Sequence, residues 1–259
     1  MLRSADSFTQ KWDYVPDNPV SVGLAGAWRE RPFSGQAHPL EYRDFGNARM
    51  KSTRTAHLAL LFIVAIVFCW SGWRPHDRFT WWLEIAPGLA GIIILLATYR
   101  RFQFTTLCYT LIALHICILC VGGHYTYARV PAFDWLRPIF GWHRNHYDRL
   151  GHFMQGFVPA MIAREVFIRL NVVHRKKWIP FLVVSVCLAI SAFYELIEWR
   201  MAIISGSAAN DFIGSQGDVW DTQADMAWAL IGAICALLLL SHFHDRTLWN
   251  IDPRKEPAE

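Results

Sequence analysis

Six apolar stretches divide the chain, and short polar segments separate them. Each stretch is about 17 to 22 residues long, which is the length of helix that crosses a hydrocarbon layer of ~30 Å. The stretches cover residues 57–73, 82–99, 105–125, 150–168, 179–199 and 225–241. This pattern predicts an all-α fold, a polytopic membrane helix bundle with six transmembrane helices.

The composition agrees with a membrane protein and excludes one function class. Of the 259 residues, 54% are hydrophobic and 13 are Trp, which is too apolar for an ordinary soluble domain. The net charge is +4, and the basic residues lie at the ends of the apolar stretches. A single basic stripe, the feature expected of a nucleic-acid-binding protein, is absent from the sequence. We therefore expect membrane lipids and no nucleic acid as partners, and the sequence indicates no particular protein partner.

Basic residues also predict the orientation, because short loops rich in Lys and Arg stay on the cytoplasmic side. Such residues occur in both tails, at Arg100 and Arg101, and between Arg169 and Lys177. Both termini are therefore expected in the cytoplasm. Residues 1–54 and 246–259 would be cytoplasmic tails, and residues 55–245 the six-helix transmembrane domain. The opposing loops also carry arginines, which weakens this asymmetry without reversing it.

Strongly polar side chains outside the tails concentrate in three segments, residues 146–155, 194–199 and 217–225. The predicted topology places all three at the outer end of the bundle, since the fourth and sixth helices begin there and the fifth ends there. At about 100° per residue, the polar positions of each helix share one face. For the sixth helix this requires that the helix extend back to Asp218. These positions are Asp148, His152 and Gln155 on the fourth helix, Glu195 and Glu198 on the fifth, and Asp218, Asp221 and Asp225 on the sixth. Lipid would not accept such faces, so they should point at one another or into a water-filled cavity.

Clustered carboxylates need a compensating charge, because each unpaired charge in a low-dielectric environment costs several kcal/mol. Arg144, Arg149 and Arg200 could supply it, some carboxyl groups could be protonated, or a cation could bind. A network of salt bridges that only ties the helix ends together is one interpretation. The other is a divalent metal site, because His146 and His152 with carboxylate oxygens form a ligand set for Zn²⁺, Mn²⁺ or non-haem iron.

Three ordered motifs resemble the YjdF-like family of bacterial inner-membrane proteins. They are His-Tyr-Asp-Arg-Leu-Gly-His-Phe at residues 146–153, Tyr-Glu-Leu-Ile-Glu-Trp at 194–199 and Gly-Asp-Val-Trp-Asp-Thr-Gln-Ala-Asp-Met at 217–226. The resemblance covers residues 55 to 245 and implies a multi-pass protein of the bacterial inner membrane with a periplasmic outer side. It brings no established reaction with it. A weaker similarity, an Asp shortly before a His and a later Asp-x-x-x-Asp, links the chain to VanZ-like proteins.

These observations favour a metal-dependent membrane enzyme whose site opens to the periplasmic leaflet and acts on a lipid or another envelope component. The hypothesis assigns metal binding to His146, Asp148, His152, Asp218 and Asp221, catalysis to Glu195, Glu198 and Asp225, and substrate binding to Arg149 and Arg200. One carboxylate would act as a general base on a bound water, and the arginines would bind an anionic head group. The alternative is a non-catalytic assembly or scaffold protein, or a cation or proton pathway that uses the same acids.

Overall fold

The computed structural model describes residues 53–205 and 215–249, and within these two stretches the regular structure is entirely helical. The helices are α2 (Thr53–Gly72), α3 (Arg78–Thr98), α4 (Thr106–Tyr125), α5 (Pro131–Phe140), α6 (Tyr147–Arg169), α7 (Ile179–Ser205) and α9 (Asp221–Trp249), with a 3₁₀ turn η2 (Lys176–Trp178) before α7. The predicted amino-terminal tail and most of the predicted carboxy-terminal tail lie outside the described residues.

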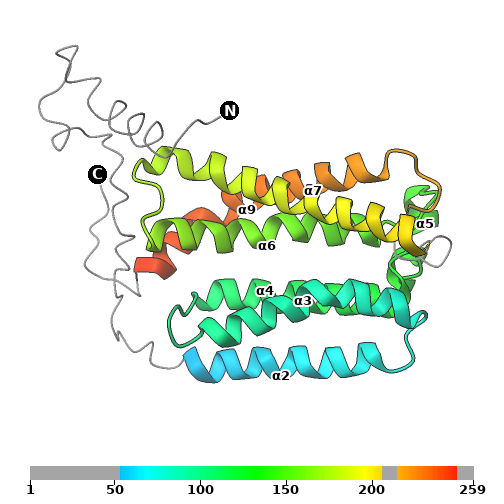
Figure 1. The fold of residues 1–259 in the computed structure, drawn as a ribbon, viewed down its shortest axis with the longest axis horizontal. Helices are drawn as coiled ribbons and strands as arrows, with labels where there is room; N and C mark the ends of the chain where they lie inside the picture. The colour runs from blue at the N-terminus through cyan, green and yellow to red at the C-terminus, as the bar shows by residue number, and fades with distance from the viewer. Residues whose placement is uncertain (1–52, 206–214, 250–259) are drawn as a thin grey trace, which may run out of the picture. The chain divides into compact units, whose positions relative to one another are not determined.

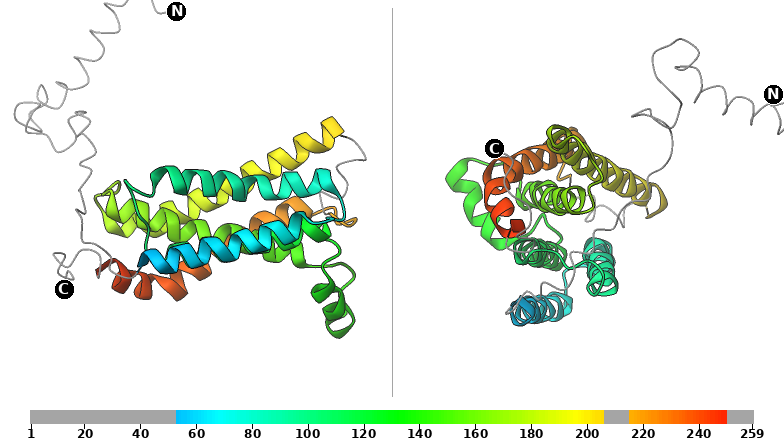
Figure 2. Two further views of the ribbon diagram at one scale, coloured as in Figure 1. Left: turned by 90° about the horizontal axis from the view of Figure 1, so that it is seen from below. Right: turned by 90° about the vertical axis from the view of Figure 1, so that its left-hand side faces the viewer.

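Two helices, α4 and α6, hold the bundle together. Helix α4 packs against α2 and α3 on one side and against α6 on the other, and α6 also packs against α7 and α9. Figures 1 and 2 show the resulting arrangement, with α2, α3 and α4 forming one group and α6, α7 and α9 the other. Helices α4 and α6 therefore form the contact between the two groups.

Five helical segments are long and apolar enough to cross a membrane, and they include α2, α3, α4, α7 and α9. Helix α6 does not meet the same criterion because it carries charged residues near both ends, among them Asp148, Arg149, Glu165 and Arg169. Those four side chains are buried, so α6 turns its polar groups toward its neighbours rather than toward lipid. The prediction of an all-α bundle of membrane-spanning helices is confirmed, with five candidate spans in the described residues.

The helices begin and end beyond several predicted boundaries. Helix α7 continues past residue 199 to Ser205, and α9 begins at Asp221, one turn before the predicted span. Asp221 and Asp225 consequently lie on one helix, whereas Asp218 precedes it. The sequence pattern missed α5, because ten residues containing Pro131 and Pro138 do not form an apolar run. Helix α5 has no buried residue and lies at one end of the bundle (Figure 2).

Glycines allow α6 and α9 to approach very closely. A Cβ atom at Gly156 would collide with the backbone of Ala229, and one at Gly232 would collide with the backbone of Phe153. Small residues at such positions let two membrane helices pack backbone to backbone. This contact fixes α9 against α6 and places Asp221 and Asp225 beside the first turns of α6.

Candidate functional site

One end of the bundle collects most of the polar groups that the sequence singled out, and we call it the His146 end. Helix α6 begins there at Tyr147, α9 begins there at Asp221, and α7 ends there. The segment just before α6 is anchored by Asn145, whose backbone N–H donates to Gln216 Oε1 at 2.9 Å and whose carbonyl accepts from Gln216 Nε2 at 2.9 Å. This two-way contact joins the start of α6 to the segment that leads into α9.

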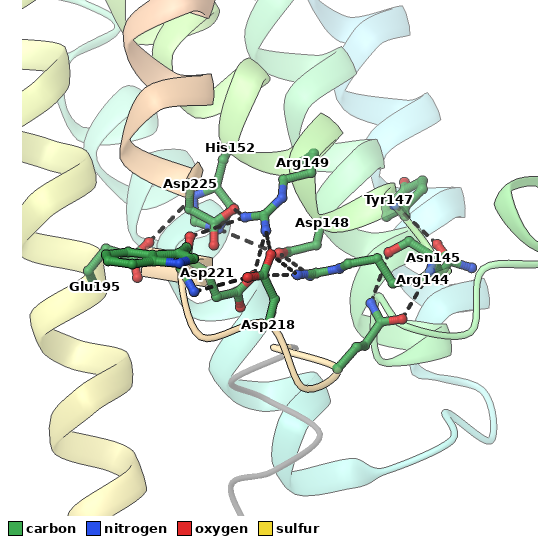
Figure 3. Close-up of polar contacts among 12 residues, drawn as sticks. Arg144, Asn145, Tyr147, Asp148, Arg149, His152, Glu195, Asp218, Asp221 and Asp225 are labelled. Atoms are coloured by element: carbon green, nitrogen blue, oxygen red, sulfur yellow. Dashed lines mark hydrogen bonds and ion pairs between the residues drawn. The ribbon is translucent and has the colours of Figure 1, made fainter. Parts of the chain in front are cut away.

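Arg149 in the first turn of α6 and Arg144 in the segment before it bind the aspartates of this end (Figure 3). Arg149 lies 3.0 Å from Asp218 and 2.7 Å from Asp221, and it also forms an ion pair with Asp225. Arg144 lies 2.5 Å from Asp221, and 3.4 Å from Asp218. Both arginines are buried, as are Asp221 and Asp225. Each of the three aspartates on α9 and in the segment before it therefore pairs with at least one guanidinium group.

Two predicted site residues, His146 and Asp218, lie outside the helices and have shifted pKa values. The backbone N–H of Trp220, 2.9 Å away, lowers the pKa of Asp218, and Arg149 and Arg144 lower it further. Burial lowers the pKa of His146, and the nearby positive charges of Arg144 and Arg149 act in the same direction. His146 is half-buried and packs edge-on against Trp142, with 4.8 Å between ring centroids. Both residues thus lie in the field of the arginine pair.

His152, one turn further along α6, is surrounded by oxygen atoms. Its Nε2 lies 3.5 Å from Asp148 Oδ1 and 3.7 Å from Asp225 Oδ1. Its Nδ1 lies 3.1 Å from Gln155 Oε1 and 3.8 Å from Glu195 Oε1. The imidazole is only 5% exposed. Both ring nitrogens therefore face carboxylate or amide oxygens in a buried position, which suits either a doubly protonated ring or a ring that binds a cation.

Two buried glutamates of α7 complete this part of the site without an arginine. Glu195 and Glu198 are 5% and 9% exposed, and neither forms an ion pair with Arg or Lys in the described part of the chain. Glu195 Oε1 is buried without a hydrogen-bond partner among the described residues. Ligand atoms of His152, Glu195 and Glu198 all lie within 4.8 Å of one another. A bound cation is one partner that could satisfy such an arrangement.

A second possible ligand set shares the same imidazole but has other partners already. Atoms of Asp148, His152 and Asp225 also lie within 4.8 Å of one another. Asp148 forms an ion pair with Arg144 at 3.5 Å, and Asp225 forms one with Arg149. Each of these aspartates has an arginine partner, whereas neither glutamate has one among the described residues.

The structure brings some of the predicted site residues together and leaves others apart. His152, Asp148, Asp225, Glu195 and Glu198 belong to the ligand groups just described. Among the described residues these groups do not include the remaining predicted ligands, which are His146, Asp218 and Asp221. Arg200, which was predicted to bind substrate, is exposed on α7 and forms no ion pair with a described residue.

Sequence reasoning missed Glu84, which lies on α3 and is buried at 6% exposure. The hydroxyl of Tyr194 donates to Glu84 Oε2 at 3.4 Å, and Tyr194 in turn packs near His152, with 6.3 Å between ring centroids. A signal was available, since Glu84 is the one charged residue inside an otherwise apolar predicted span. An ionisable residue within a membrane helix is a functional-site hypothesis in its own right.

A cleft of about 630 Å³ opens beside this cluster, between α3 and α4 on one side and α6 and α7 on the other. Its polar end is formed by Glu84, Asp148, His152 and Glu198, and most of its remaining wall is apolar. Ligand pockets are commonly about 300–1,000 Å³, with an apolar lining and a few convergent polar groups. The cleft therefore connects the acidic cluster with a space large enough for a ligand.

A second buried polar cluster lies at the opposite end of the bundle, around Glu165 of α6. Its carboxylate accepts hydrogen bonds from the Thr105 backbone N–H at 2.9 Å and hydroxyl at 2.7 Å, and from Arg169 at 2.7 Å. Cys108 and His244 also donate to it, at 3.1 and 3.0 Å. The cluster thus connects the start of α4, the end of α6 and the end of α9. His244 and Cys108 were not predicted here, because Cys108 lies within an apolar stretch and His244 lies beside the predicted carboxy-terminal tail, outside the three polar segments.

Hydrogen bonding indicates that this second cluster is structural. Arg164 donates to His244 Nδ1 at 3.0 Å, so the imidazole proton is on Nε2, which donates to Glu165. Arg169 compensates Glu165, and Arg164 forms an ion pair with Asp245 at 2.7 Å. A metal on Nε2 of a neutral ring would require the proton on Nδ1, where Arg164 is already a donor. The cluster has balanced charges and no evident need for a cation.

The fold and the cluster define a polytopic α-helical membrane protein with a buried acidic site. The family described as "Predicted membrane protein (DUF2238)" matches residues 56–246. The chain is also 49% identical to "Inner membrane protein YjdF" of Escherichia coli (strain K12) over 185 residues, which cover 71% of this chain and 88% of that protein. No solved structure matches the chain.

The chain therefore belongs to the DUF2238 family of membrane proteins, and the YjdF-like resemblance that its motifs indicated is confirmed. It is an inner-membrane protein with several membrane-spanning helices.

Proposed function

We propose that the protein is a membrane-embedded, metal-dependent enzyme that acts on a lipid or another envelope component. The cation would bind between His152, Glu195 and Glu198. The observation that carries this proposal is the pair of buried glutamates, which have no arginine or lysine partner in the described chain, with Glu195 Oε1 lacking any hydrogen bond there. His152 and Glu198 also border a cleft that offers space for a substrate.

The charges of the cluster support a bound cation. Arg144 and Arg149 bind the four aspartates Asp148, Asp218, Asp221 and Asp225. Two guanidinium groups can offset only two of those four charges, and Glu84, Glu195 and Glu198 add three carboxyl groups with one imidazole near them. Burying uncompensated carboxylates costs several kcal/mol each, so they must gain protons or a counter-ion. A divalent ion would offset two of these charges at once.

The surroundings of His152 suit a metal-bound imidazole. With the ion on Nδ1, on the side of Glu195, the Nε2 proton would point to Asp148 and Asp225, 3.5 and 3.7 Å away. Carboxylates commonly orient metal-binding histidines through the second ring nitrogen in this way. Zn²⁺, Mn²⁺ or iron would be compatible with one nitrogen and two carboxylate ligands, which leave further positions for water or substrate.

We assign catalytic roles according to position. Glu198, which lines the cleft, would hold the ion through one carboxylate oxygen and would act through the other as the general base on a bound water molecule. Asp225 would orient His152 while it compensates Arg149, and Arg149 would act on the substrate only indirectly because three aspartates already bind it. Arg200 is exposed and remains our proposed contact for an anionic head group.

We further propose that α6 crosses the membrane as a sixth span and that both termini are cytoplasmic. Helix α6 has 23 residues, about 35 Å, and is enclosed by its neighbours. Exposed tryptophans collect at the His146 end, and Trp is typical of a membrane–water interface. They are Trp73, Trp82, Trp135, Trp199 and Trp220. The cluster and the mouth of its cleft would then face the periplasmic leaflet.

A proton or cation pathway through the bundle receives less support. The two polar clusters are separated along α6 by residues 156–163, Gly-Phe-Val-Pro-Ala-Met-Ile-Ala, which carry no polar side chain and span about 12 Å. Val158, Ala160 and Met161 within that segment are almost completely buried in the apolar core. A conducting route would need polar groups there.

Chelation tests the proposal on the purified protein. A bound ion stabilises the native state by mass action, by about 2.7 kcal/mol at a hundredfold excess over Kd. We expect EDTA to lower the melting temperature of the wild type, and Zn²⁺ or Mn²⁺ to restore it. Glu195→Gln and His152→Phe should melt lower without EDTA and should no longer respond to it.

Asp134→Asn is the matched control. It removes a carboxylate at the same end of the bundle, and this carboxylate does not belong to the ligand groups. It should respond to EDTA as the wild type does. If the glutamates are protonated instead, EDTA should have no effect and Glu195→Gln should be neutral or stabilising. That result would contradict the metal site and leave a scaffold.

A further inference from the structure

The cleft beside the acidic cluster has a polar end and a long apolar wall. Along α6 it runs from Asp148 to Ile162, fourteen residues or about 21 Å of helix. One leaflet accounts for about half of the ~30 Å hydrocarbon core, so a single hydrocarbon chain has room along this wall. A head group at the polar end would lie near Glu84, His152 and Glu198.

The mouth of the cleft lies between α3 and α7. On the α3 side it is formed by small residues, among them Ala86, Ala90 and Gly91. On the α7 side Phe193 and Ile197 line the cleft and are 64% and 38% exposed. In a membrane this opening would be in contact with lipid and not with water, because both edges are apolar and lie on predicted spans. A ligand would reach the cluster sideways from the bilayer.

We infer that the substrate is a lipid of the surrounding bilayer, whose hydrocarbon chain lies in the cleft and whose head group reaches Glu84, His152 and Glu198. This inference rests on the proposed function, since it names the substrate class of the same site. A water-soluble substrate would not need a long apolar wall that opens toward lipid. His115 Nε2, which is buried at this cleft without a partner among the described residues, offers a further polar contact.

Gly91 provides a direct way to block the cleft. A Cβ atom added at Gly91 would meet nothing within 4 Å, so the position faces open space. It lies about two turns along α3 from Glu84 and does not belong to the ligand groups. Gly91→Phe should therefore fill the apolar part of the cleft while leaving the metal ligands in place. Ile94→Phe is the matched control, because Ile94 is on the same helix, is 62% exposed and does not line the cleft.

The test uses the full chain in liposomes of phosphatidylethanolamine and phosphatidylglycerol. A trace of phosphatidylethanolamine carries a photoreactive diazirine on its acyl chain, and labelled peptides are identified by mass spectrometry. Leu238 and Leu239 on α9, which are 78% and 70% exposed, report lipid that merely surrounds the protein. In the wild type we expect the cleft walls around Gly91 and Phe193 to be labelled above this reference.

Gly91→Phe should lose the labelling of the cleft walls and keep that of Leu238 and Leu239, whereas Ile94→Phe should match the wild type. Ala90→Phe provides a second block should Gly91→Phe not fold. Wall labelling that equals the α9 reference, or that survives both blocks, would overturn the inference. Metal content is measured on the same samples, because Gly91→Phe should not change it. Wild-type protein whose cleft walls are labelled above the α9 reference but which holds no metal would count against the proposed function and not against the lipid.

Discussion

Arg149 is the residue whose removal should most disturb the acidic end of the bundle. It is 6% exposed and binds Asp218, Asp221 and Asp225. In Arg149→Met the side chain keeps an apolar stem but loses its charge. Arg144 still contacts Asp221 and Asp218, whereas Asp225, with a side chain only 2% exposed, is left without an arginine among the described residues. Removing one partner of a buried ion pair costs about 3–5 kcal/mol. Because Arg144 remains, we expect about 3 kcal/mol.

Equilibrium unfolding in detergent, followed by circular dichroism, would measure this cost. Arg137→Met is the control, since Arg137 lies 3.5 Å from Asp134 with both side chains about 40% exposed. An exposed pair of that kind contributes about 0–1 kcal/mol. The double variant Arg149→Met with Asp225→Asn should recover part of the loss, because the stranded charge is gone. Equal stability of the Arg149 and Arg137 variants would refute the view that buried arginines compensate the aspartates.

Three further predictions concern the fold. Gly156→Leu should destabilise the protein by about 1–3 kcal/mol or prevent folding, because its side chain collides with the Ala229 backbone, and thermal unfolding measures this. Asp77→Ala should cost about 1 kcal/mol, since Asp77 caps α3 by accepting from the Thr80 N–H at 2.6 Å. That hydrogen bond lowers the pKa of Asp77, so the cap's contribution is present above the usual value of 3.8 and is lost as the pH falls through the folded value. In a cysteine-free background, Phe140→Cys should react with an impermeant thiol reagent from the periplasm and Arg175→Cys should not, and the reverse would overturn the orientation.

Hydrophobic patterning predicted the helices well because membrane helices are dictated by local composition. The stretch 105–125 coincides almost completely with α4, Thr106–Tyr125. Helix α6 is less apolar, yet its polar stripe indicated a buried face, and Asp148, His152 and Gln155 do gather at one site. Helix α5 could not be predicted in this way, since its apolar residues Trp135 and Ile139 remain exposed.

Which acid pairs with which arginine depends on contacts between helices, and the spacing of residues along the sequence does not predict these contacts. The sequence offered arginines, protonation and a bound cation as alternatives for all the acids, and in the structure arginines bind the aspartates but not Glu195 and Glu198. Asp221 is bound by Arg144 and Arg149, whereas Glu195 is not, because α7 presents its glutamates to the other side of His152. Glu84 was not predicted as a site residue because α3 is far along the chain from the polar motifs. Glu84 nevertheless lines the same cleft as His152 and Glu198.

The metal content of the purified protein tests the central claim most directly. The full chain would be purified without chelators, loaded with Zn²⁺ or Mn²⁺, desalted and analysed by inductively coupled plasma mass spectrometry. A single site at His152, Glu195 and Glu198 predicts about one ion per chain in the wild type and in Asp134→Asn. It also predicts loss of that ion in Glu195→Gln and in Glu198→Gln. Wild-type protein that retains no ion after loading, or glutamate variants that retain as much as the wild type, would contradict the account.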